Sequence, residues 1–409
     1  MVNLSASIVM TSEPSKYIRA GYLIDGSGGP IQEDVLLTVI GGRIAEIARF
    51  APDNSPDAAR IIDLSRCTIL PPLVDSHVHL ALSGTVAQEI RARQLTADYQ
   101  EAATIIAQNL GGHFSHGVLA VRDGGDKNGY ARRYKQAMAG DPAPLVRIQA
   151  SGRAWHQQGR YGSMLGHHPD DNETLATALV RDHEPSDQLK IINSGPNSLS
   201  EFGKETPPQF SLAEMRAAVA SAHRRGLPVM VHANGVLPVQ MAIAAGVDSI
   251  EHGYFMGRDN LERMAERQIL WVPTLFAMQA CTHSGIAANS ANAGEIAARN
   301  VESQLQQVAL AKALGVPIAA GSDAGCYGVM HGEALVEEIM LLTKGGFSLP
   351  EALKCATSIG ARLLGLADLG LLAKGRRANF LVTSGTPAQL PCQQASLEAI
   401  YINGIALRL

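Results

Sequence analysis

The sequence predicts a (β/α)8 TIM barrel joined to a small β-sandwich domain that both termini form. Three observations predict this fold class. Short apolar, strand-like segments alternate with helical patterns through the middle of the chain, and both ends contain mainly strand-like runs. Side chains typical of metal sites close or follow several apolar segments, and such side chains converge only if parallel strands lie side by side.

The N-terminal region, residues 17–72, is predicted to form strands joined by tight turns. The alternating runs at 35–40 and 43–47 flank the pair Gly41-Gly42. A glycine pair between two alternating runs is a hairpin signal.

The C-terminal region repeats this style. Strand-like runs occur at 378–382 and 399–402, and the second turns at Asn403-Gly404. Two β-rich ends around a long middle indicate one small domain built from both termini. We therefore assign residues 1–72 and 369–409 to the small domain and residues 73–368 to the catalytic barrel.

Eight segments of the middle region are candidate barrel strands. They are 68–74, 117–122, 145–150, 188–193, 228–232, 247–251, 269–273 and 316–320. Among the helical patterns between them, one opens with Ser211 followed three residues later by Glu214, the signature of a capping box. A doubly wound open sheet is the rival architecture. It predicts a glycine-rich phosphate-binding turn after an early strand, and the sequence contains none.

Composition favours a globular enzyme that acts on small molecules. The 409 residues are 46% hydrophobic and carry a formal net charge of −4, so we expect neither nucleic acid nor a membrane as a partner. No apolar run approaches the roughly 20 residues of a membrane-spanning helix, and residues 1–16 lack the pattern of an export signal. The five cysteines are scattered and odd in number, which is typical of reduced thiols and predicts a cytoplasmic location.

Two histidines follow the first candidate strand, in the segment Val74-Asp75-Ser76-His77-Val78-His79. Residues i and i+2 of a strand share a face. Both imidazoles therefore point the same way at the C-terminal end of the strand, where barrel enzymes place their sites. For this pair alone, two hydrogen-bonded polar residues at a barrel mouth are the alternative interpretation.

Lys190, His232, His252 and Asp323 also lie in or directly after candidate strands. A lysine in a strand buried on both faces must reach solvent, pair or change its charge. Lys190 is therefore either a snorkelling side chain or a candidate to carry a carboxylate adduct, which turns a cation into an oxygen ligand. Each histidine alone is more often a core or rim residue, and Asp323 alone would be a helix N-cap. Together with the histidine pair, they give six candidate metal ligands on five strand ends.

The segments around these residues resemble the amidohydrolase superfamily, metal-dependent hydrolases on a (β/α)8 barrel. The matching segments are Leu70–His79, Val231–Gly235, Ala245–Gly253 and Gly321–Gly325, with Asp25–Gly28 and Gly370–Gly375 in the β-rich ends. The resemblance thus covers nearly the whole chain.

One branch of the superfamily is resembled in particular. Lys190 with Ser194-Gly195, and Asp323 with His331-Gly332, are similar to imidazolonepropionase-like and prolidase-like (Xaa-Pro dipeptidase-type) amidohydrolases. Members of this branch cleave dipeptides and related amides.

The resemblance implies two divalent metal ions. His77, His79 and Asp323 would hold a buried ion, and His232 and His252 would hold a more exposed one. Zinc suits these ligand types best, and manganese, iron and cobalt suit them as well.

The resemblance also implies a mechanism. Lys190, carboxylated by carbon dioxide, would bridge the two ions, which share a hydroxide nucleophile. Asp323 would take the proton of that water and pass it to the leaving amine. His156, after the third strand, lies in a segment that departs from the branch's pattern but could still polarise the scissile carbonyl, so Asp323, His252 and His156 are the candidate catalytic residues.

Substrate choice in this fold depends on the loops above the strands. The loop from Arg153 to Tyr161 does not reproduce the glycine-histidine pattern of the prolidase-like branch, but it is rich in donors. Arg153 and Arg160 are candidates to bind a substrate carboxylate, because a guanidinium matches its geometry. Tyr161 is a further candidate contact, and His331 would contribute from the other side. A solvated loop is the alternative interpretation of the Arg153–Tyr161 segment.

The predicted reaction is hydrolysis of an amide C–N bond in a small molecule, either a dipeptide or an N-acyl amino acid. Cyclic amide hydrolysis of the imidazolonepropionase type and mononuclear deamination are alternatives. Deaminases usually have a glutamate where this chain has Gly235, and they lack a lysine equivalent to Lys190, so both positions argue against deamination. A barrel that serves as a scaffold is the alternative from another class, but such relatives typically lack several ligands. The sequence leaves a homo-oligomer open.

Overall fold

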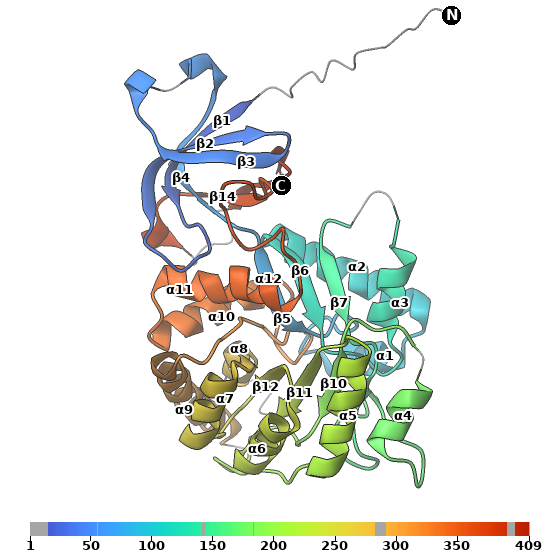
Figure 1. Cartoon of the computed structure of the whole chain (residues 1–409). Coiled ribbons are helices and arrows are strands. Elements are labelled where there is room, and N and C mark those ends of the chain that lie inside the picture. Colours follow the sequence, from blue (N-terminus) through green and yellow to red (C-terminus); the bar gives the residue numbers. More distant parts are fainter. Residues whose placement is uncertain are drawn as a thin grey trace, which may run out of the picture. The chain divides into compact units, whose positions relative to one another are not determined.

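The computed structural model describes residues 15–54, 56–140, 144–182, 184–282, 292–390 and 397–408. The chain divides into two compact units, which Figure 1 colours along the sequence. One unit consists of the chain up to Asp25, Gly29–Pro71 and the chain from Leu371 onward. The other consists of Gly26–Gly28 and Pro72–Gly370. Gly26–Gly28, Pro72, Leu369 and Gly370 were predicted to belong to the small domain, but they lie in the barrel unit.

Seven strands from both ends of the chain form one sheet in the first unit, in the order β16-β15-β14-β4-β1-β2-β3. They are β1 (Lys16–Leu23), β2 (Gln32–Ile40), β3 (Arg43–Arg49), β4 (Ile61–Leu70), β14 (Phe380–Ser384), β15 (Leu397–Ile402) and β16 (Ile405–Arg408). Short 3-10 helices lie at Pro52–Asn54, Ala58–Arg60 and Pro387–Gln389.

Alternation along the strands builds the core of this unit. Ile18 and Ala20 of β1 and Val35, Leu37 and Val39 of β2 are buried, as the two-residue period of a strand requires. Side chains from β4, β14 and β15 join the same apolar cluster.

The sheet also curls back on itself. Ile44 N at the start of β3 donates to Arg376 O at 2.9 Å, and Gly375 N donates to Ile44 O at 2.7 Å. The edge strand β3 is therefore bonded to residues that precede β14, and the sheet encloses its core.

Both predicted glycine turns are confirmed. Gly41 and Gly42 have φ of 56° and 70°, and Asn403 and Gly404 have φ of 52° and 73°. Positive φ at both central residues is the type I′ geometry that matches the twist of a two-residue hairpin.

Parallel strands form the wall of the second unit. They are β5 (Leu73–Val78), β6 (Val118–Asp123), β7 (Arg147–Ala150), β8 (Ala154–Trp155), β9 (Gly166–His167), β10 (Leu189–Ile192), β11 (Val229–Ala233), β12 (Ser249–His252) and β13 (Leu270–Val272). One sheet has the order β5-β6-β7 and the other β13-β12-β11-β10-β8-β9. Asp187 N donates to Ala150 O at 3.0 Å, which links β7 to the segment that leads into β10.

Residues 316–320 close the barrel. Ile318 forms a parallel bridge with Trp271 of β13, and Trp271 N donates to Pro317 O at 2.9 Å. On the other side, Ser76 N of β5 donates to Ala320 O at 3.0 Å. The eighth predicted strand thus joins the last sheet to the first, and the predicted fold class is confirmed.

The first predicted strand, 68–74, is two strands in the structure. β4 ends at Leu70 in the small sheet, and β5 begins at Leu73 in the barrel. Pro71 and Pro72 separate them, because proline has no backbone N–H to donate to a ladder. The histidine pair consequently closes β5.

Helices follow most barrel strands and surround them in Figure 1. They are α1 (Gln88–Thr96), α2 (Tyr99–Ser115), α3 (Tyr130–Ala137), α4 (Leu175–Arg181), α5 (Leu212–Arg224), α6 (Val236–Ala245), α7 (Arg258–Arg267), α8 (Leu275–Ala280), α9 (Ala293–Leu314), α10 (Glu333–Lys344), α11 (Leu349–Lys354), the π-helical segment η3 (Cys355–Ile359) and α12 (Gly360–Leu363). The predicted capping box of α5 is confirmed, since the Ser211 side chain accepts from Glu214 N and Ser211 N donates to Glu214 Oε2 at 2.9 Å.

Two further expectations concern cysteines and membranes. Cys67, Cys281, Cys326 and Cys355 are free thiols, and Cys392 lies outside the described residues. Among the described helices, none has the length and apolar character needed to cross a membrane.

Candidate metal centre and active site

The barrel brings the candidate ligands to the carboxyl ends of its strands. His77 lies near the end of β5 and His79 directly follows it, while His232 and His252 lie near the ends of β11 and β12. Asp323 follows the eighth strand, and its N–H donates to His77 O at 2.8 Å. None of these five residues is more than 9% exposed.

Lys190 lies deeper in the barrel than His232. The strand register pairs Ile192 with His232, and Lys190 with Met230, so Lys190 belongs to the layer below. It is 1% exposed. Burial lowers its pKa to about 8, with Arg122 contributing and Glu251 opposing.

Three side chains form a compact cluster suited to a metal ion. Ligand atoms of His77, His79 and Asp323 all lie within 4.8 Å of one another. Asp323 Oδ1 is 3.6 Å from His77 Nε2 and 3.3 Å from His79 Nε2.

Hydrogen bonds direct the free nitrogen lone pairs of both histidines toward this cluster. His77 Nδ1 is 2.6 Å from Glu251 Oε2, and His79 Nδ1 is 2.9 Å from Gly125 O. A carboxylate and a carbonyl only accept, so in each neutral ring Nδ1 holds the proton and Nε2 is an acceptor.

The cluster leaves two acceptors facing each other. His77 Nε2 and Asp323 Oδ1 are buried, and neither has a hydrogen-bond partner within the described residues. Buried polar atoms normally have partners, and two acceptors that face each other need a cation or a hydrogen-bond donor between them. Two imidazoles and a carboxylate are ligands that zinc and similar ions prefer, so the donor set fits a divalent metal.

Gly124 keeps one side of this cluster open. A Cβ at position 124 would lie 2.9 Å from His79 Cε1 and 3.2 Å from His77 Nε2. Both distances are shorter than ordinary van der Waals contact, so glycine preserves the space beside the imidazoles.

Electrostatics also favours a cation in the cluster. Burial, followed by the charge of Lys190, lowers the pKa of His77 to about 4. Burial also opposes a charge on His79, but the neighbouring Asp323 carboxylate outweighs it and raises the pKa of His79. Burial raises the pKa of Asp323, but the close imidazoles of His79 and His77 hold it below its usual range. A carboxylate that draws a proton to a buried imidazole also attracts a metal ion.

Two charged residues behind the cluster were missed by sequence reasoning. Arg122 donates to both carboxylate oxygens of Glu251 at 2.7 and 2.8 Å, and Ser249 donates to Oε1 at 2.6 Å. Burial raises the pKa of Glu251, but Arg122 and His77 keep it below its usual range. Glu251 is therefore a fixed carboxylate that orients His77. The available signal was a charged residue at an inner position of each of two barrel strands, where parallel strands are usually apolar.

His232 and His252 lie beside the cluster, but their hydrogen bonds do not direct both Nε2 lone pairs toward a metal site. Their ring centroids are 4.6 Å apart, and that of His252 is 5.1 Å from that of His77. His232 Nε2 is 3.1 Å from Gly195 O, which makes this nitrogen a donor. His252 Nδ1 is 2.7 Å from Thr274 Oγ1, a hydroxyl that either donates or accepts.

Three residues in this region have a left-handed backbone. The φ angle is 66° at His252, 47° at Thr274 and 58° at Asp323. Such a conformation in a non-glycine residue costs on the order of 1–3 kcal/mol and persists where the surroundings enforce it. At His252, the carbonyl oxygen accepts from Trp271 Nε1 at 2.9 Å and from Gln304 Nε2 at 2.5 Å.

Two of the predicted loop residues lie near the strand ends. The Tyr161 ring centroid is 5.4 Å from that of His232, and burial raises the pKa of Tyr161, which keeps its hydroxyl protonated. His156 directly follows β8 and is 3% exposed. Its Nδ1 is 2.8 Å from Gln157 O, so Nε2 of the neutral ring is an acceptor and has no proton to offer a substrate carbonyl.

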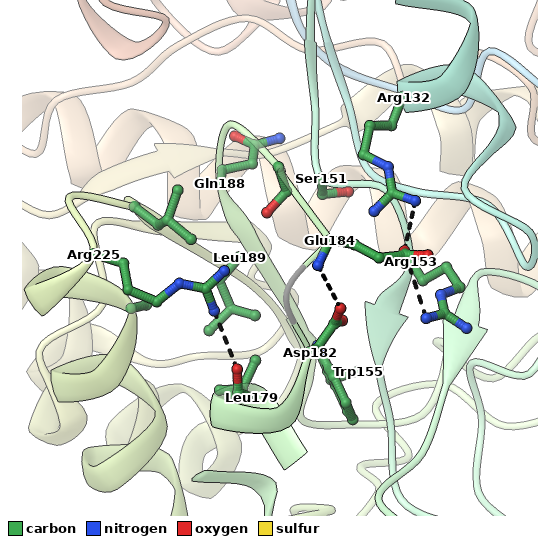
Figure 2. Close-up of a pocket in the computed structure, with 13 residues that line it drawn as sticks. Arg132, Ser151, Arg153, Trp155, Leu179, Asp182, Glu184, Gln188, Leu189 and Arg225 are labelled. Atoms are coloured by element: carbon green, nitrogen blue, oxygen red, sulfur yellow. Dashed lines mark hydrogen bonds and ion pairs between the residues drawn. The ribbon is translucent and has the colours of Figure 1, made fainter. Parts of the chain in front are cut away.

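Arg153 directly precedes β8 and lies on the opposite side of it from His156. Arg153 and Trp155 line a small pocket together with Arg132 and Glu184 (Figure 2). Arg153 Nη2 is 3.5 Å from Glu184 Oε2, which also pairs with Arg132. None of the six candidate metal ligands lines this pocket. Side chains two residues apart share a face, so the position of Arg153 does not support a clamp on a substrate carboxylate.

Arg160 and His331 are both bonded to backbone carbonyls. Arg160 Nη2 donates to Pro207 O at 3.1 Å, and the residue is exposed. His331 Nε2 is 2.7 Å from Leu82 O, and its Nδ1 is 3.0 Å from His113 Nε2. Both ring nitrogens of His331 have internal partners, so this residue anchors the loop after the eighth strand and offers no free nitrogen to a substrate.

Comparison with known proteins agrees with this geometry. A sequence model described as the amidohydrolase family matches residues 68–404. The chain belongs to the amidohydrolase family. The match extends from the last strand before the barrel to the turn that follows β15.

Amidohydrolases of two kinds are among its relatives. An imidazolonepropionase of Deinococcus radiodurans is 24% identical over 372 residues, 87% of this chain and 86% of that protein. An uncharacterized protein of Mycobacterium tuberculosis is 27% identical over 388 residues, 93% of this chain and 94% of that protein. A solved structure of a Xaa-Pro dipeptidase with methionine bound in its active site superposes with a TM-score of 0.79 and 26% identity, covering 97% of this chain and 100% of that chain.

These findings confirm the predicted superfamily and branch. They also confirm that the protein is a hydrolytic enzyme of the class that acts on carbon–nitrogen bonds.

Proposed function

We propose that this amidohydrolase uses divalent metal ions to cleave an amide C–N bond in a dipeptide or an N-acyl amino acid. The observation that carries the proposal is the buried cluster of His77, His79 and Asp323, where a nitrogen and an oxygen acceptor face each other without a partner. The likeness to a Xaa-Pro dipeptidase supports a substrate with an amide next to a free carboxylate.

Six residues would hold two ions, with zinc as the expected metal. His77, His79 and Asp323 would hold the first, and His232 and His252 the second. Lys190, carboxylated by carbon dioxide, would bridge them; its pKa of about 8 leaves part of the amine neutral near pH 7, the form that reacts with carbon dioxide. Ions bound at such a site polarise a carbonyl and lower the pKa of water toward neutrality.

Asp323 is the proposed proton carrier. Its depressed pKa keeps the carboxylate ionised at neutral pH, and Oδ1 has no other partner within the described residues. Asp323 would accept a proton from the attacking water and donate it to the leaving amine, a contribution typically worth about 10²–10⁴-fold in rate.

Residues of the loop after the third strand would orient the substrate. The Tyr161 hydroxyl remains protonated, and the ring that carries it lies 5.4 Å from the His232 ring between centroids, so it is the better donor to the scissile carbonyl. His156 would accept the amide N–H through Nε2, in place of the carbonyl contact that the sequence suggested. Arg160 remains the candidate for the substrate carboxylate, because it is exposed on the same loop.

Hydrolysis of a cyclic amide is the second candidate function, favoured by the similarity to an imidazolonepropionase over most of the chain. Deamination is less well supported. Gly235 has φ of 87°, a backbone conformation that glutamate rarely adopts, so the deaminase glutamate is disfavoured at this position.

Metal analysis combined with a substrate screen tests the proposal. Protein purified with zinc supplied should contain close to two ions per chain and hydrolyse at least one member of a panel of dipeptides, N-acyl amino acids and cyclic amides. His77→Asn should lose metal and activity, whereas His223→Asn, at an exposed histidine on α5 that pairs with Asp248, should retain both. An enzyme that remains fully active after complete metal removal would contradict the proposal.

A further inference from the structure

Glu338 is a fully buried carboxylate that the proposed reaction does not use. It lies on α10 and is 0% exposed. Its Oε1 accepts from Leu275 N at 3.1 Å, and its Oε2 accepts from Phe276 N at 2.8 Å. These are the first two backbone N–H groups of α8, so a side chain from another helix caps this one.

The residue in the N-cap position of α8 does not cap it. Thr274 is of a type that commonly caps helices through its side-chain oxygen, but its side chain makes no cap hydrogen bond. Thr274 Oγ1 is instead 2.7 Å from His252 Nδ1, and its backbone is left-handed, with φ of 47°.

We propose that Glu338 is a positioning residue for His252. Glu338 satisfies the start of α8 in place of Thr274, which leaves the Thr274 hydroxyl free to orient the His252 imidazole. The inference rests on the proposed function, in which His252 is a metal ligand.

The physical reason is competition for one hydroxyl. Leu275 is 0% exposed, and a buried backbone N–H without a partner is costly. Without the Glu338 carboxylate, the hydroxyl of the adjacent Thr274 becomes the nearest side-chain acceptor in the N-cap position. A Thr274 that turns to cap α8 leaves His252 Nδ1, and the direction of the Nε2 lone pair is then no longer fixed.

Zinc titration of the metal-free protein against a chromophoric chelator tests this inference. Glu338→Gln keeps the shape but presents an NH2 group to one of the two backbone N–H donors. Thr274→Val removes the hydroxyl and keeps the shape. Each variant should weaken binding of one of the two zinc ions by roughly 10–100-fold, the usual effect of losing a partner of a ligating histidine, and Thr274→Ser should restore wild-type binding.

Non-additivity separates a relay from two independent effects. If Glu338 acts through Thr274, the double variant that combines Glu338→Gln with Thr274→Val should bind zinc no more weakly than Thr274→Val alone. Ser211→Ala, which removes the cap of α5 far along the chain, is the matched control. It should lower the melting temperature and leave both zinc affinities unchanged.

Three outcomes would overturn the inference. If Glu338→Gln behaves like Ser211→Ala, with a lower melting temperature and full zinc affinity, Glu338 is only a helix cap. Additive losses in the double variant would show separate actions. An unchanged His252 ¹⁵N resonance in metal-free Glu338→Gln would show that the imidazole has not moved. The resonance needs no metal, so it tests Glu338 even if the wild-type protein fails to bind zinc and the proposed function is rejected. Should Glu338→Gln not fold, Glu338→Asp, which keeps the carboxyl group but shortens the side chain by one methylene, replaces it in every measurement.

Discussion

The two halves of the candidate site differ in how completely the protein orients their ligands. The first half consists of His77, His79 and Asp323, and the second half of Lys190, His232 and His252. In the first half, both histidines donate through Nδ1 to groups that only accept, so both Nε2 lone pairs are directed inward. In the second half, one imidazole donates to a carbonyl through Nε2 and the other meets a hydroxyl.

The difference follows from where the partners come from. Glu251, which orients His77, lies in a barrel strand and is fixed by Arg122 from another strand. Thr274, which orients His252, lies at the start of a six-residue helix and has a strained backbone. Strand-held partners are more rigid than partners on short elements, so we expect the first half to bind its ion more tightly than the second.

The largest expected effect comes from Asp323→Asn. The amide keeps the shape but cannot carry the proton, so kcat should fall by about 10²–10⁴-fold. Steady-state kinetics with measured metal content checks this prediction. Near-normal kcat in protein with its full complement of metal would rule out the proton-carrier role.

Lys190→Met should abolish zinc binding in the second half of the site, while the first half keeps its ion. The variant cannot form the proposed bridge, so zinc content should fall from about two ions to about one per chain, with most of the activity lost. Elemental analysis of the purified variant gives the answer, and two retained ions would exclude the carboxylated lysine.

Lys190→Met should also change how the stability of the metal-free protein depends on pH. The pKa of Lys190 is about 8 in the folded state against 10.5 for an unperturbed lysine, so the unfolded state binds more protons between these values. The free energy of unfolding of the wild type should therefore rise as the pH rises from 8 to 10.5. Below pH 8, the full cost of burying the protonated Lys190 amine should be present. Each unit by which the Lys190 pKa is lowered destabilises the wild type by about 1.4 kcal/mol. Lys190→Met should therefore melt at a higher temperature than the wild type at pH 7, and the difference in melting temperature should disappear by pH 10.5. A gap that stays constant over this range would contradict the assignment.

Gly124→Ala should disturb the first half alone. The added Cβ would press against His79 Cε1 and His77 Nε2, so zinc affinity of the tighter site should drop by roughly 10–100-fold, as for other changes that displace a ligand. Gly140→Ala is the matched control, because a Cβ there meets no atom within 4 Å. Equal losses at both zinc sites would show that the two halves are not independent.

The smallest expected effect separates two arginines of one loop. Arg160→Met should raise KM roughly tenfold for a substrate with a free carboxylate, the equivalent of one charge-assisted hydrogen bond, and should spare its neutral amide analogue. Arg153→Met should leave both KM values near wild type, since Arg153 pairs with Glu184 in a separate pocket. If the effects are reversed, Arg153 and not Arg160 binds the substrate carboxylate.

Much of the fold was predictable because its signals are local. Glycine pairs that need positive φ, alternating apolar residues and the Ser211–Glu214 capping box depend on neighbours in sequence, and each forms as predicted. The first barrel strand was misplaced by several residues, because an apolar run across Pro71 and Pro72 gives no indication of where one ladder ends and another begins.

The sequence by itself determined the barrel, the strands that carry or precede the six candidate ligands, and the family. Strand periodicity and residue type are one-dimensional properties, and parallel strands bring their ends together whatever their partners are. Only the tertiary structure decided that Arg153 faces away from His156 and that His331 is bonded on both nitrogens. It alone revealed Arg122 and Glu251 behind His77, and Glu338 at the start of α8. These are contacts between residues 60 to more than 200 positions apart, and no local pattern specifies which distant side chain a hydrogen-bonding group will meet.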